Sequence, residues 1–142
     1  MRDVPSYGHT LAATLLAGIL AWAIMLIPGV AFNDKVIGVH RDAILGKPDI
    51  DSGDRVLMYL VWLALIFVGY YVYAWCVQKL LPALQPSFQI ERWDAFLALV
   101  VTGMLAAFIG WVFPFLGIVV AIFVAPIMVN IWVTRSGAPA TA

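Results

Sequence analysis

The stretch AAFIGWVFPFLGIVVA, residues 106–121, is apolar on both sides of Pro114 and decides how the last third of the chain folds. It lies inside an uncharged block, Ala95–Val133. As one helix this block would be about 58 Å long, at about 1.5 Å per residue. The hydrocarbon core of a bilayer is only about 30 Å thick, and helix tilt absorbs only a small excess of length. The block is therefore too long for one crossing of a membrane.

Pro114 marks the place where the block divides into residues 95–112 and 115–133, each long enough to cross a bilayer. Proline lacks a backbone N–H and its ring clashes with the preceding helical turn, and Gly117 follows as a permissive backbone position. We therefore predict a tight hairpin that turns at Pro114. The open alternative is a kinked span followed by an interfacial or re-entrant half-helix, which would move the C-terminus to the opposite face.

The composition of the whole chain points to lipid as its solvent. Of 142 residues, 64% are hydrophobic and 11% are charged, whereas soluble domains carry about 25% charged residues. A chain of this length cannot bury so much apolar surface in its own core. The net charge of zero provides no basic surface for nucleic acid. A single cysteine, Cys76, excludes an internal disulfide and a Cys-based zinc site.

Two further uncharged stretches, residues 11–32 and 56–77, are also long enough to cross the bilayer. The apolar part of the first is too long for a signal peptide, so we predict a true membrane helix there. The expected fold is an all-α integral membrane protein, a bundle of four transmembrane helices made of two helical hairpins. Residues 1–142 are expected to form one membrane domain.

The distribution of Lys and Arg does not determine the orientation, because both predicted faces carry equal numbers of these residues. The loop 33–55 holds most of the acidic residues, which favours cytoplasmic termini. We expect a plasma membrane or a bacterial inner membrane.

Small residues recur at four-residue spacing in the predicted spans, a pattern that allows close helix packing in lipid. The first span carries Ala13, Ala17 and Ala21. The predicted packing residues of the last two spans are Ala98, Thr102, Ala106, Gly110, Gly117, Ala121 and Ala125.

No Asp, Glu, Lys, Arg or His falls within any predicted span. Pumps and coupled transporters generally need such residues at membrane depth, so the pattern disfavours them. Asn130 and Thr102 are the notable polar candidates inside the spans, and each is expected to bond to a neighbouring helix or to its own backbone. We find no phosphate-binding loop and no hydrolase or metalloprotease motif, and we predict no cofactor.

The loop 33–55 contains KPDIDSGDR, residues 47–55, whose Asp49, Asp51 and Asp54 could supply oxygen ligands to a hard cation such as Ca²⁺. The alternative is a solvated turn at Ser52–Gly53. Residues 36–45 favour a short amphipathic helix on the membrane surface. The tail 136–142 is small and polar enough to be flexible.

These patterns predict a non-catalytic membrane protein, an accessory, assembly or stabilising subunit. Its partners are the lipid bilayer and other membrane proteins or copies of itself, and not nucleic acid. One alternative is a small oligomeric channel or transporter component with a pathway between subunits, through Thr102, Asn130 or tyrosines of the second span. Another is an interfacial enzyme that acts on lipid through the loop 33–55.

Overall fold

The computed structural model describes residues 3–31 and 52–136. The chain divides into two compact units: a larger unit, Met1–Ala21 with Tyr70–Ala142, and a smaller unit, Trp22–Gly69. The predicted interfacial helix at 36–45, Asp49, Asp51 and the tail 137–142 lie outside the described residues, and so does the side chain of Asp54.

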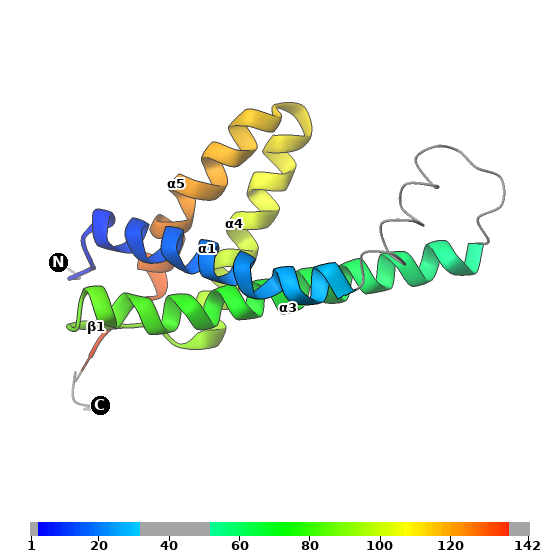
Figure 1. The fold of residues 1–142 in the computed structure, drawn as a ribbon. Helices are drawn as coiled ribbons and strands as arrows, with labels where there is room; N and C mark the ends of the chain where they lie inside the picture. The colour runs from blue at the N-terminus through cyan, green and yellow to red at the C-terminus, as the bar shows by residue number, and fades with distance from the viewer. Residues whose placement is uncertain (1–2, 32–51, 137–142) are drawn as a thin grey trace. The chain divides into compact units, whose positions relative to one another are not determined.

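Four long apolar helices form the fold, and the prediction of an all-α four-span membrane bundle is confirmed (Figure 1). They are α1 (Tyr7–Ala31), α3 (Ser52–Leu84), α4 (Arg92–Val112) and α5 (Pro114–Trp132). Stretches of each helix are long and apolar enough to cross a bilayer: Tyr7–Gly29, Arg55–Leu84, Arg92–Val112 and Pro114–Trp132. The protein is therefore a multi-pass membrane protein.

Three helices extend beyond the spans expected from the sequence, each for a local reason. Helix α1 begins at Tyr7 because the Ser6 side-chain oxygen accepts the His9 backbone N–H at 3.4 Å, which caps the first turn. Helix α3 continues to Leu84 because Leu81 in its last turns is fully buried. Helix α4 begins at Arg92, whose long side chain contacts α3.

The α4–α5 hairpin turns through one residue, Phe113, with φ −128° and ψ 88°. The Phe113 N–H donates to the Ile109 carbonyl at 2.9 Å, and the Gly117 N–H donates to the Phe113 carbonyl at 3.1 Å. Pro114 is the first residue of α5. The N–H of a first helical residue has no partner within the helix, so a proline there costs no hydrogen bond. Figure 1 shows α4 and α5 side by side with this turn at one end.

The other end of the hairpin is closed by a two-stranded antiparallel sheet of β1 (Phe88–Gln89) and β2 (Thr134–Arg135). Phe88 pairs with Arg135 and Gln89 pairs with Thr134, and the Ser136 N–H donates to the Ser87 carbonyl at 2.9 Å. The segment before α4 is thereby joined to the segment after α5.

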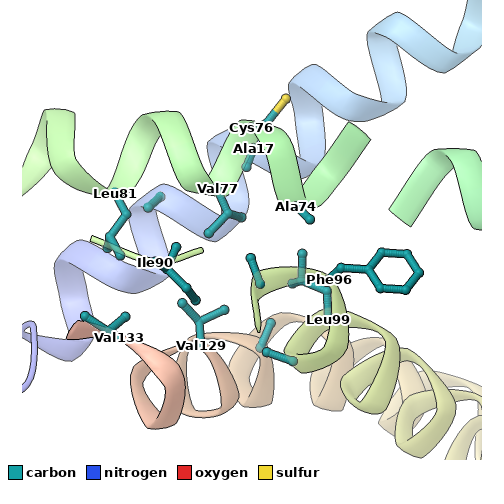
Figure 2. Packing of buried hydrophobic residues seen from close by; sticks show 14 of the residues in the cluster. Ala17, Ala74, Cys76, Val77, Leu81, Ile90, Phe96, Leu99, Val129 and Val133 are labelled. Carbon is teal, nitrogen blue, oxygen red and sulfur yellow. The ribbon is translucent and has the colours of Figure 1, made fainter. Parts of the chain in front are cut away.

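The core of the larger unit lies where its four helical segments meet this sheet. Figure 2 shows Val77 and Leu81 of α3 on the same side as Ile90, which lies between β1 and α4, and Val129 of α5. Leu99 of α4 belongs to the same cluster. Contacts between helices run throughout this unit, so it is a bundle and not a set of separate spans.

Candidate functional site

Several polar side chains of the larger unit bond to one another near the starts of α1 and α4, the end of α5 and the second half of α3. We call this region the polar end. Its members are Ser6, Thr10, Tyr71, Gln78, Arg92 and Asn130. They form two groups, one around Asn130 and one around Arg92.

Asn130 joins α5 to the N-terminal segment. Its Oδ1 accepts a hydrogen bond from the hydroxyl of the fully buried Thr10 at 2.7 Å, and its Nδ2 donates to the Pro5 carbonyl at 3.3 Å. The Tyr7 hydroxyl adds a bond to the Phe123 carbonyl at 2.8 Å. Three hydrogen bonds therefore hold the start of the chain against α5.

Arg92 joins α4 to α3. Its Nε donates to Gln78 Oε1 at 3.2 Å, and its Nη1 donates to the Tyr71 hydroxyl at 2.7 Å. The guanidinium carbon lies 5.5 Å from the centre of the Tyr71 ring, within the range of a cation–π contact. The sequence interpretation placed Arg92 in the link between spans and so did not identify this group.

Thr102 lies in the middle of α4 and is buried, and its hydroxyl donates to the Ala98 carbonyl of the same helix at 2.8 Å. Thr14 of α1 behaves in the same way, with a bond of 3.0 Å to the Leu11 carbonyl. Both hydroxyls are therefore satisfied within their own helices and contribute no bond between helices.

We predict that Thr102→Val changes stability by no more than about 0.6 kcal/mol, because valine keeps the shape and the Ala98 carbonyl keeps its backbone partner. The free energy of unfolding, measured in bicelles by titration with a denaturing detergent, checks this. A much larger loss would show that the Thr102 hydroxyl has a second role in the fold.

The predicted packing residues occupy different environments. Gly110 and Gly117 meet backbone to backbone, so that a Cβ on Gly117 would lie 2.6 Å from the Gly110 Cα. The buried members are Ala98, Thr102, Ala106, Gly117 and Ala125. Ala121 is exposed and Gly110 is half-buried.

Two close contacts of glycine with tyrosine were not predicted. The Tyr70 hydroxyl occupies the space that a Cβ on Gly103 would need, and the Tyr73 ring packs on Gly18 at 3.6 Å from the position of a Cβ. These contacts join α3 to α4 and α3 to α1. The two tyrosines were visible in the sequence, but nothing in the spacing showed which helix each one faces.

The candidate metal ligands Asp49, Asp51 and Asp54 cannot be placed, because two lie outside the described residues and the side chain of the third is not described. Among residues 3–31 and 52–136, no group of three or more His, Cys, Asp or Glu side chains is arranged to hold a metal ion. Cys76 is a buried free thiol within the core of the larger unit.

No family model, curated protein or solved structure matches this chain. Its function must therefore be inferred from the contacts described above.

Proposed function

We propose that this chain is a non-catalytic membrane protein that acts as an accessory, assembly or stabilising subunit, packed against other membrane proteins or copies of itself. It would act as a single membrane domain in a plasma or bacterial inner membrane, with both termini cytoplasmic. The small residues of α4 and α5 would serve as helix-packing faces.

The main support for this proposal is that the polar groups in the spans form hydrogen bonds with other groups of the same chain. Thr10 and Asn130 bond to each other, and Thr102 and Thr14 bond to their own helices. A transport pathway or an active site needs polar groups that are open to a substrate. These groups are instead satisfied within the chain, either between α1 and α5 or within one helix, which supports a structural role and weighs against a pathway through Thr102 or Asn130.

The exposure of side chains in the smaller unit favours the proposal of a protein partner. Its described side chains are all exposed or half-buried, with none fully buried between 53 and 69. Leu63 is 66% exposed and Tyr59 is 67% exposed on this stretch of α3. A phenolic hydroxyl is better accommodated beside protein than beside lipid tails, because it needs a hydrogen-bond partner.

A photocrosslinking side chain at Leu63 is expected to give a discrete covalent adduct with another membrane protein or with a second copy. The same group placed at the buried Leu81 is the matched control and is expected to give only internal products. Purification in mild detergent should bring down the same partner in stoichiometric amount. A solitary monomer whose Leu63 adducts are all lipid would contradict the proposal.

A further inference from the structure

The lengths of α4 and α5 lead us to expect Arg92 at the level of the lipid phosphates. Helix α4 has 21 residues and α5 has 19 residues, so their lengths are about 31 and 28 Å. These lengths match the hydrocarbon core of a bilayer, which is about 30 Å thick. If the Phe113 turn lies at one boundary of the core, a helix of this length brings the first residue of α4 to the other boundary, where the headgroups begin.

The hydrogen-bond partners of Arg92 hold its side chain in place but do not neutralise its positive charge. Gln78 and Tyr71 are both neutral acceptors, and they take up the Nε–H and one N–H of Nη1. The guanidinium has five N–H donors, so the Nη2 group is left to face another acceptor. Two anchoring bonds fix the direction in which that group points.

The nearby carboxylates do not balance this charge. Glu91 and Asp94 are close to Arg92 in sequence, yet within residues 3–31 and 52–136 no carboxylate forms an ion pair with it. Asp3 is engaged with Arg135 at 3.1 Å, with both side chains largely exposed. A half-buried cation at the edge of a low-dielectric layer is costly without a counter-ion.

An exposed aromatic side chain, Trp93, packs against the same Tyr71 ring that the guanidinium contacts. Trp93 is 58% exposed and meets Tyr71 edge to face, with ring centres 5.8 Å apart. Its ring also packs against Phe96 at 5.6 Å. Tryptophan prefers the headgroup level of a bilayer, with its ring against the upper part of the acyl chains.

We propose that Arg92, oriented by Gln78 and Tyr71 and flanked by Trp93, binds the phosphate of a membrane phospholipid. The recognised chemistry is a phosphate oxyanion, whose oxygens accept hydrogen bonds from the remaining N–H groups of the guanidinium. Phospholipid is the source because its phosphate is already concentrated at the depth of this side chain. The bound lipid would lie beside Tyr71 and Trp93 and neutralise a cation that has no carboxylate partner among residues 3–31 and 52–136.

The test counts bound lipids by native mass spectrometry of the purified chain in neutral detergent, titrated with phosphatidylglycerol. Arg92→Gln is expected to weaken binding of the tightest lipid at least tenfold. The matched control Arg135→Gln removes the same charge from the same end of the bundle and is expected to change binding less than twofold. Equal binding by Arg92→Gln and the unmodified protein would overturn the proposal.

Two further arms identify the source of the phosphate. Diacylglycerol, which lacks phosphate, is expected not to occupy the site, and inorganic phosphate is expected not to displace the lipid. Displacement by inorganic phosphate, or equal occupancy by diacylglycerol, would overturn the assignment to phospholipid. If Arg92→Gln does not fold, Tyr71→Phe keeps the charge but removes an orienting hydroxyl, and we expect several-fold weaker binding.

Discussion

Gly117→Ala is expected to destabilise the α4–α5 hairpin by about 1–3 kcal/mol, the usual range for overpacking a close contact. A Cβ at this position would lie 2.6 Å from the Gly110 Cα and 2.7 Å from the Ala106 carbonyl oxygen. Both are backbone atoms of α4, so no side chain can rotate away to make room. The two helices would have to separate near their turn.

The measurement is the free energy of unfolding in bicelles, followed by circular dichroism during titration with a denaturing detergent. Gly8→Ala in the first turn of α1 is the matched control, because a Cβ there would meet nothing within 4 Å. Alanine is the better helix former, so the control is expected to be neutral or slightly stabilising. A neutral Gly117→Ala would mean that α4 and α5 are not in backbone contact.

Asn130→Leu is expected to cost about 1–2 kcal/mol of stability, because it removes the bonds to Thr10 and to the Pro5 carbonyl at once. Thr10 can still donate to the Ser6 carbonyl, which lies 3.3 Å away, so its hydroxyl does not become wholly unpaired. The loss should therefore stay below the full penalty for burying an unsatisfied group.

A double-mutant cycle with Thr10→Val isolates the contact between the two side chains. The double variant should lose less than the sum of the single variants, by about 0.5–1.5 kcal/mol. Strict additivity would show that the bond contributes nothing to the fold. Liposomes test the channel alternative: an ion flux that disappears in a fully folded Asn130→Leu variant would favour transport over the structural role.

The number of spans and the all-α class follow from the sequence because lipid imposes them. Backbone groups in hydrocarbon must bond within the chain, so long uncharged stretches become helices. Length then limits how much of the chain one helix can use, and the block 95–133 exceeds that limit. The fold class can therefore be predicted from the sequence without any knowledge of side-chain contacts.

The polar end could be predicted only in part. Asn130 stands out because an amide in an apolar span needs a partner, but its bond to Thr10 joins residues 120 positions apart in sequence. Arg92 was missed because it precedes the uncharged block by a few residues. The hydrogen bonds of Arg92 depend on α3 extending to Leu84. They also depend on the segment between α3 and α4 turning back, so that α4 begins beside Gln78 and Tyr71.

The glycine contacts show the same limit. Four-residue spacing identified Gly110 and Gly117 as candidates, but it omitted Gly103, which lies under the Tyr70 hydroxyl. The spacing also included Ala121, which lies on the exposed side of α5. Periodicity describes one helix at a time, whereas a contact depends on the large side chain that a neighbouring helix presents.

The one-residue turn at Phe113 limits where this protein can be extended. Trp111 and Phe115 on either side of it are 90% and 80% exposed, and the short connection offers no polar segment to carry an added sequence. An epitope tag or a fused reporter domain placed there would separate α4 from α5 at the point where Gly110 and Gly117 are in backbone contact.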